Sequence, residues 1–119
     1  MNQASKKVSD LTYLSNCMAG NKKLIREIMD VFLKQAPEEM MSLNKGVDKQ
    51  DYELIRRTTH TMKSSVSIMG IASLVLILKQ IQDLAICNSD MLKISQLKNE
   101  ADSILKQAID EIVEARKDY

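Results

Sequence analysis

The amino-acid sequence predicts an all-α fold, an antiparallel up-and-down four-helix bundle with a short extra N-terminal helix. Three Gly and one Pro in 119 residues, together with abundant Leu, Ile, Met, Lys, Glu and Gln, favour helices throughout. No period-2 strand pattern and no Asn-Gly hairpin turn competes with this interpretation. Apolar residues recur at helical spacing in successive segments, and the short loops between these segments make consecutive helices antiparallel neighbours.

Two helices are expected in the first part of the chain. A short one runs from about Asp10 to Ala19, and Gly20 can end it in a left-handed conformation. Asn21 can cap a longer helix, whose expected apolar stripe is Leu24, Ile25, Ile28, Met29, Phe32 and Ala36. Pro37 would interrupt or bend this helix because it lacks an N–H. The stripe resumes at Met40, Met41 and Leu43, so we expect a kinked continuation that ends near Gly46.

Two further helices follow a turn at residues 47–51. Asp48 or Asp51 can cap the first of them, which contains the only histidine of the chain and ends near Gly70. The next helix starts almost at once and runs from Ile71 to about Cys87. The connection between these two helices is therefore a tight turn, and we expect the two to lie side by side.

The last two helices differ in how much apolar surface they carry. Leu76 and Ile77 widen the apolar surface of the fourth helix beyond one packing seam, so part of it can face a partner, and Met29 is a further candidate for such a patch. A turn with capping residues at 88–90 precedes the final helix. We expect this helix to end soon after Ala115. Its stripe is Ile94, Leu97, Ala101, Ile104, Leu105, Ala108 and Ile112.

The histidine, His60, is expected on the solvent side of its helix. At about 100° per residue it lies about 160° from Met62, the centre of the buried stripe. Lys63 and Ser64 lie within one turn of the ring, on the same outer surface. This position argues against a core histidine. A solvent-facing imidazole beside a cation can be a nucleophile toward a phosphoryl group, and an incidental surface histidine is the alternative.

Composition and charge disfavour several classes of function. The formal net charge is +1 with the two signs interspersed, and one Phe, three Tyr and no Trp provide few stacking platforms, so we expect no nucleic-acid partner. An independent enzyme is disfavoured because no acidic residue adjoins the histidine and no phosphate-binding loop is present. Residues 68–78 are too short an apolar stretch to cross a bilayer, and residues 1–7 do not resemble a signal peptide. We therefore expect a cytoplasmic protein without a membrane segment.

The two cysteines are not expected to bind a metal. Cys17 and Cys87 match no metal spacing, and with a single histidine an ordinary zinc ligand set is hard to assemble. We expect both to be small buried hydrophobic residues in a reducing compartment, in preference to a disulfide. No metal site is predicted.

The run His60-Thr-Met-Lys-Ser-Ser, followed by Gly70 ten residues later, resembles the histidine-containing phosphotransfer (HPt) domain. The final helix agrees in pattern only, and we expect residues 1–119 to form one domain. Over roughly residues 10–85, the segments that carry the likeness are Asp10-Leu-Thr-Tyr-Leu, Gly20-Asn21, Phe32-Leu-Lys-Gln-Ala-Pro37, Asp51-Tyr-Glu-Leu-Ile-Arg-Arg and Leu78-Lys-Gln-Ile-Gln-Asp-Leu84.

The resemblance implies a phosphorelay intermediate of two-component signal transduction. His60 would accept a phosphoryl group from the aspartyl phosphate of a receiver domain and pass it to another receiver, while Lys63 balances the phosphate charge. The chain would be a phosphohistidine carrier without kinase activity of its own, and Mg²⁺ would belong to the partner receiver domain. The positions that would contact partners are Ser64, Gln35, Gln82 and Ser67.

The partners that the resemblance implies are response-regulator receiver domains and a hybrid sensor histidine kinase, and we expect a monomer. Whether the chain stands alone or belongs to a hybrid kinase stays open, as does the direction of phosphate flow. The family usually has Gly directly after the lysine, and we interpret Ser64 as a tolerated variant because serine is small. The alternative is a helical adaptor that binds receivers or other proteins without being phosphorylated, but the presence of both His60 and Lys63 argues against it.

Overall fold

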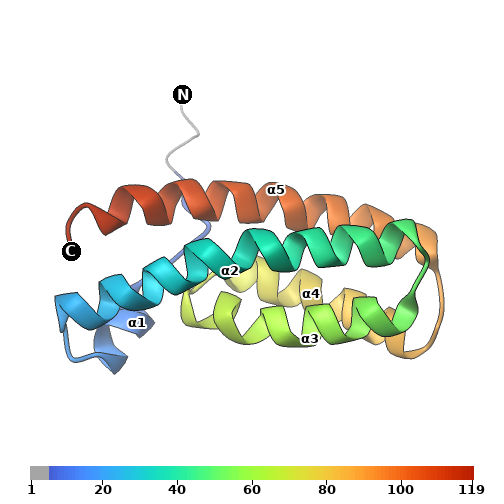
Figure 1. Cartoon of the computed structure of the whole chain (residues 1–119), viewed down its shortest axis with the longest axis horizontal. Helices are drawn as coiled ribbons and strands as arrows, with labels where there is room; N and C mark the ends of the chain where they lie inside the picture. The colour runs from blue at the N-terminus through green and yellow to red at the C-terminus, as the bar shows by residue number, and fades with distance from the viewer. Residues whose placement is uncertain (1–5) are drawn as a thin grey trace.

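The computed structural model describes residues 6–119, and within that range it contains five α-helices and no strand. The four long helices lie side by side, and the short one lies at one end of them (Figure 1). The expected all-α fold is confirmed. The helices are α1 (Thr12–Cys17), α2 (Lys22–Asp48), α3 (Tyr52–Ile68), α4 (Ala72–Ile86) and α5 (Met91–Arg116).

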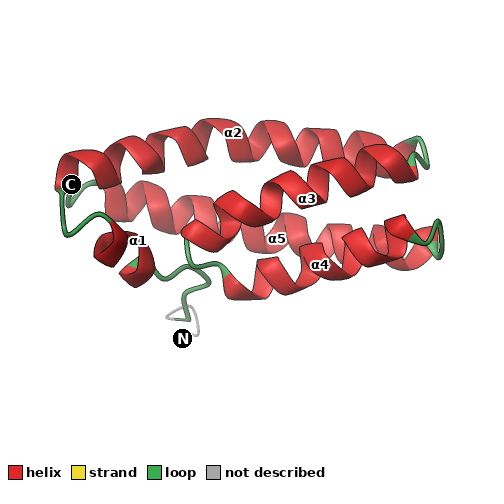
Figure 2. Ribbon diagram, turned by 90° about the horizontal axis from the view of Figure 1, so that it is seen from below, coloured by secondary structure: helices red, strands yellow, loops and turns green. Residues whose placement is uncertain are grey.

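Each long helix packs against two others. α2 contacts α3 and α5, and α4 also contacts α3 and α5, in the arrangement that Figure 2 shows. The buried apolar residues of all four helices belong to one core. Consecutive long helices run in opposite directions, as the colour sequence in Figure 1 shows. The inward faces are thereby covered, and the outward face of each helix is left to solvent. The largest side chains with almost no exposure are Leu14, Ile25, Met29, Leu43, Ile55, Met62, Met69, Ile71, Leu74, Leu78, Ile81 and Ile94.

Polar side chains cap three of the long helices at their N-termini. Asn21, Asp51 and Asp90 each accept a hydrogen bond from the main-chain N–H three residues later, at 3.0–3.1 Å. Such caps contribute roughly 1 kcal/mol each. Of the two aspartates considered for the start of α3, Asp51 is the cap. This fixes the first turn of α3 and therefore which of its residues face outward.

The second helix passes through Pro37 without ending. α2 continues to Asp48, two residues beyond the expected end, so the predicted continuation is confirmed. Pro37 is exposed, where the main-chain carbonyl that it leaves without a donor can be hydrated. Most of the expected stripe of α2 is buried, but Leu24 is 42% exposed at its start. The expectation for Met41 is wrong, because this side chain is 71% exposed between the buried Met40 and Leu43.

The turn between α3 and α4 depends on a glycine. Gly70 has φ +66°, and a Cβ at this position would lie 1.9 Å from the carbonyl oxygen of Asp10. The Asp10 N–H also donates to the Met69 carbonyl at 3.4 Å. Gly20 has a similar φ of +69°, but nothing lies within 4 Å of a Cβ there. Gly70 is thus required both by backbone conformation and by the chain that crosses it.

Glu111 of α5 ties the segment before α1 to the long helices. Its carboxylate accepts hydrogen bonds from the main-chain N–H groups of Val8 and Ser9 at 2.9 Å, and from the Ser9 hydroxyl. Partial burial acts to raise the pKa of Glu111, but these hydrogen bonds outweigh it and hold that pKa below its ordinary value. With the contact at Gly70, they place this segment between α5 and the α3–α4 turn.

The expectation that both cysteines are buried is wrong. Cys17 and Cys87 are free thiols and both are exposed. Cys17 is the last residue of the short α1 and Cys87 is the C-cap of α4, so neither belongs to a stripe that faces the core. Of the residues expected in a partner-facing apolar surface, Leu76 is 62% exposed and Ile77 is half-buried. The expectation for Met29 is wrong, because this side chain is fully buried in the core.

Within residues 6–119, no helix is both long and apolar enough to span a bilayer. The expectation that the chain begins without a signal peptide rests in large part on residues 1–5, which lie outside the described residues.

Candidate functional site

The outer face of α3 carries the histidine. His60 lies in the middle of the helix and is exposed, whereas its neighbours Thr59 and Met62 have no exposed surface. The exposure that the helical wheel predicts for His60 is confirmed. The imidazole is thus open to a partner, and the residues next to it hold the helix in the core.

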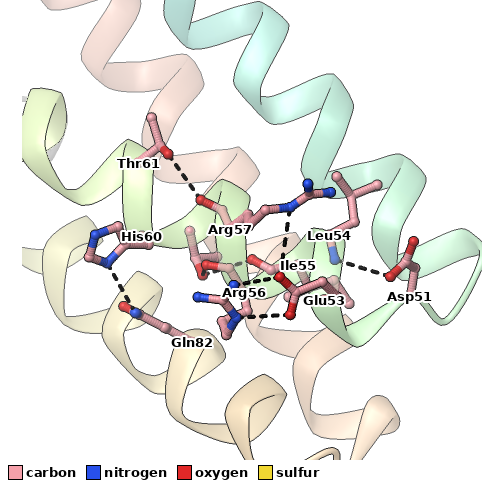
Figure 3. Close-up of polar contacts among 10 residues, drawn as sticks. Asp51, Glu53, Leu54, Ile55, Arg56, Arg57, His60, Thr61 and Gln82 are labelled. Carbon is pink, nitrogen blue, oxygen red and sulfur yellow. Dashed lines mark hydrogen bonds and ion pairs between the residues drawn. The ribbon is translucent and has the colours of Figure 1, made fainter.

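A glutamine from the adjacent helix contacts the ring. Nε2 of Gln82 on α4 lies 3.3 Å from Nδ1 of His60 (Figure 3). The other ring nitrogen, Nε2, forms no hydrogen bond with the described residues. The side-chain oxygen of Gln82 is buried and has no hydrogen-bond partner among residues 6–119. The contact orients the ring toward α4, and the tautomer of the ring depends on which end of the Gln82 amide faces Nδ1.

Charged side chains surround the histidine along α3. On the N-terminal side, Arg56 forms two hydrogen bonds to the Glu53 carboxylate, the longer one at 3.0 Å (Figure 3). The hydrogen bond from Arg56 holds the pKa of Glu53 below its ordinary value. Arg57 lies 4.0 Å from the same carboxylate. On the C-terminal side, Lys63 is half-buried and forms no ion pair with the described residues. The surface around His60 is therefore more cationic than anionic.

The remaining predicted site residues occupy two different surfaces. Ser64 and Ser67 are exposed one and two turns beyond His60, on the same outer face of α3. Gln35 is exposed on α2 and forms no hydrogen bond to the histidine in the described structure. The structure thus brings Gln82 into contact with His60 and leaves Gln35 on a neighbouring helix.

Sequence reasoning missed the ion pairs beside the histidine. Glu53 precedes Arg56 by three residues and Arg57 by four, a spacing that places such side chains next to each other on a helix. That spacing could have identified the cluster. Both side chains of the Glu53–Arg56 pair remain partly exposed, so its contribution to stability is small.

Within residues 6–119 there is no group of three or more His, Cys, Asp or Glu side chains arranged to hold a metal ion. The surface around His60 presents one imidazole, one amide and a few charged or hydroxyl side chains. An exposed imidazole of this kind can accept and release a phosphoryl group that another protein presents.

The model of the Hpt domain family matches residues 27–115, and the chain therefore belongs to the Hpt family. Domains of this family are phosphotransfer carriers in phosphorelays. The match includes the whole of α3 and α4, and thus both His60 and Gln82. No curated protein sequence gives a significant match.

A solved structure shares the fold over almost the whole chain. It is the crystal structure of histidine-containing phosphotransfer protein B (HptB) from Pseudomonas aeruginosa PAO1, with a TM-score of 0.87 and 19% sequence identity. The match covers 97% of this chain and 99% of that chain. The family model begins at residue 27, whereas the structural match covers 97% of this chain. The shared fold therefore extends beyond the region that the family model matches.

Proposed function

We propose that this chain is a phosphorelay intermediate whose His60 carries the phosphoryl group. It receives the group from the aspartyl phosphate of one receiver domain and passes it to the aspartate of another. The observation that supports this role best is the solvent-facing imidazole in the middle of α3, on a chain of the Hpt family. In this proposal the chain acts as a single cytoplasmic domain, a monomeric up-and-down four-helix bundle.

The proposed transfer forms one N–P bond and breaks one P–O bond. The lone pair of Nε2 of His60 attacks phosphorus, and the electrons of the P–O bond return to the aspartate of the receiver as a carboxylate. Mg²⁺ in the receiver would offset the phosphoryl charge on that side. Because the chain supplies no nucleotide, its contribution is the positioning of the nucleophile and the electrostatics around it.

Gln82 supports Nε2 as the attacking atom. An unprotonated Nε2 in a neutral ring requires the proton on Nδ1, and Nδ1–H needs an acceptor. The side-chain oxygen of Gln82 provides one when the amide turns by half a rotation, and this oxygen has no partner in its present position. Gln82 then acts as a positioning residue, because it fixes the tautomer and the direction of the ring.

Lys63 is proposed to balance the charge of the phosphoryl group. A lysine three residues after the histidine lies on the adjacent helix surface, and helical side chains lean toward the preceding turn, which brings its ammonium toward the ring. Lys63 has no carboxylate partner among the described residues that would compete for it. Ser64, Ser67 and Gln35 are proposed to face the receiver, and a hybrid sensor kinase is the proposed source of phosphate.

The decisive experiment is transfer of radiolabel from phosphorylated receivers. A panel of purified receiver domains is phosphorylated and mixed with this protein in the presence of Mg²⁺. We expect label that is labile in acid and stable in base, as a phosphoramidate is, and no label on a folded His60→Gln variant. Label on that variant, or no transfer from any receiver, would contradict the proposal. ATP alone should give no label.

A second function is a receiver-binding adaptor that is not phosphorylated. The observation in its favour is Ser64, an exposed side chain one turn from the imidazole, at the position where the resemblance to the HPt domain implies Gly. The two functions are distinguished by the same panel. A receiver that binds tightly but transfers no label to the wild-type protein would favour the adaptor.

A further inference from the structure

An apolar groove lies where α3 ends and α4 begins, and it does not include the contact between His60 and Gln82. Its volume is about 350 Å³, and part of its wall is Leu76, which is 62% exposed. Ile68, just before the turn, is also 36% exposed. The groove, called the seam groove below, is lined by Ser67, Gly70, Ile71, Ala72, Val75 and Leu76.

The seam groove continues the same line of contact between α3 and α4. Seven residues after His60 on α3 is Ser67, and seven residues before Gln82 on α4 is Val75. Since the two helices run in opposite directions, Ser67 and Val75 lie at the same level along the α3–α4 contact. Seven residues are two turns, about 10 Å along a helix. The near edge of the groove is therefore about 10 Å from the imidazole along the α3–α4 contact, and its far wall at Gly70 and Ala72 is about 15 Å away.

The seam groove also differs chemically from two other hollows on the described surface. None of its six lining residues is charged. The hollow between α2 and α3 contains Glu39 and Arg57, and the one between α2 and α5 contains Asp102 and Lys106. The centre of a protein interface is depleted of charged residues, and an uncharged hollow beside an exposed leucine has that character.

We propose that the seam groove receives an apolar side chain of the receiver domain that docks over His60. This inference rests on the proposed function, because it names where the same partner makes its apolar contact. A standard interface covers about 800 Å² on each partner, equivalent to a disc of about 16 Å radius. A receiver centred on His60 thus extends over a groove that begins about 10 Å and ends about 15 Å away. Because the ring leans toward α4, that receiver lies over the α3–α4 seam.

The test compares two exposed leucines. Leu76→Gln makes the groove polar, and Leu92→Gln is the matched control, because Leu92 is 72% exposed at the start of α5. Both variants should keep the thermal midpoint of the wild type. Calorimetric titration uses the receiver domain that labels His60 most rapidly. We expect about ten-fold weaker binding for Leu76→Gln and unchanged binding for Leu92→Gln. Ala72→Phe, which fills the groove, should also weaken binding.

The outcomes separate this inference from the function on which it rests. If a receiver labels His60 and binds Leu76→Gln and Ala72→Phe as tightly as wild type, the groove is not part of the interface and the carrier role stands. Equal weakening by Leu92→Gln would also overturn the inference, since the effect would not be local. If no receiver labels His60, the proposed function falls and the inference falls with it.

Discussion

The two faces of α3 contrast sharply although their residues alternate along one helix. Thr59 is fully buried and donates its hydroxyl to the Ile55 carbonyl at 2.8 Å, whereas the next residue, His60, is exposed. Met62 is fully buried and Ser64 is exposed. A rotation of about 100° per residue is enough to separate core from surface. Stability and the proposed chemistry should therefore respond to different substitutions within a few residues of each other.

The largest expected effect belongs to the inner face. Met62→Ala removes a fully buried side chain, and such a change typically lowers the free energy of unfolding by about 2–5 kcal/mol. Urea denaturation measures this loss. The folded fraction should still accept label from a receiver at the wild-type rate. Slower labelling per folded molecule would mean that the core also tunes the site.

The next largest effect is expected from Ser64 on the outer face. Ser64→Gln places a large side chain one turn from the imidazole and should abolish or sharply weaken receiver binding, with the core undisturbed. Ser64→Gly should bind as well as wild type or better, although it loses roughly 0.5 kcal/mol of stability through helix propensity. Calorimetric titration of both variants measures the affinities. Equal affinity of Ser64→Gln and wild type would show that the receiver does not dock over this face.

A smaller effect is expected from Lys63, which is half-buried on the flank of the same face. Lys63→Ala should keep the helical content and thermal midpoint of the wild type, while transfer slows or the lifetime of the phosphohistidine changes. Circular dichroism and a time course of label provide the two measurements. A wild-type transfer rate and lifetime would identify Lys63 as an ordinary surface charge.

The smallest effect is expected from Thr59→Val on the inner face. The Thr59 hydroxyl donates to the carbonyls of Ile55 and Arg56, at 2.8 and 3.1 Å. These carbonyls also accept main-chain hydrogen bonds within the helix, so removal of the hydroxyl leaves no buried group without a partner. The free energy of unfolding should change by about 1 kcal/mol or less, as urea denaturation would show. A much larger loss would show that Thr59 holds the turn beneath His60.

Sequence reasoning performed best where the signal is local. The caps Asn21 and Asp51, the continuation past Pro37 and the exposure of His60 all follow from residues within a few positions of one another. It failed for Cys17 and Cys87, where the average burial of cysteine was used without a helical stripe to support it. Helical periodicity is thus a stronger guide to exposure than residue type.

The sequence by itself determined the helices, most of their buried stripes and the outward direction of His60, because capping and periodicity act within one or two turns. Only the tertiary structure decided which faces meet. Three contacts join residues that are 22 to 103 positions apart in the sequence. They are the contact of Gln82 with His60, the hydrogen bond from Val8 to Glu111, and the close approach of Asp10 to Gly70. The first of these contacts depends on how far α4 is displaced along α3, and the other two depend on where the segment before α1 crosses the long helices. Packing of the whole core sets both.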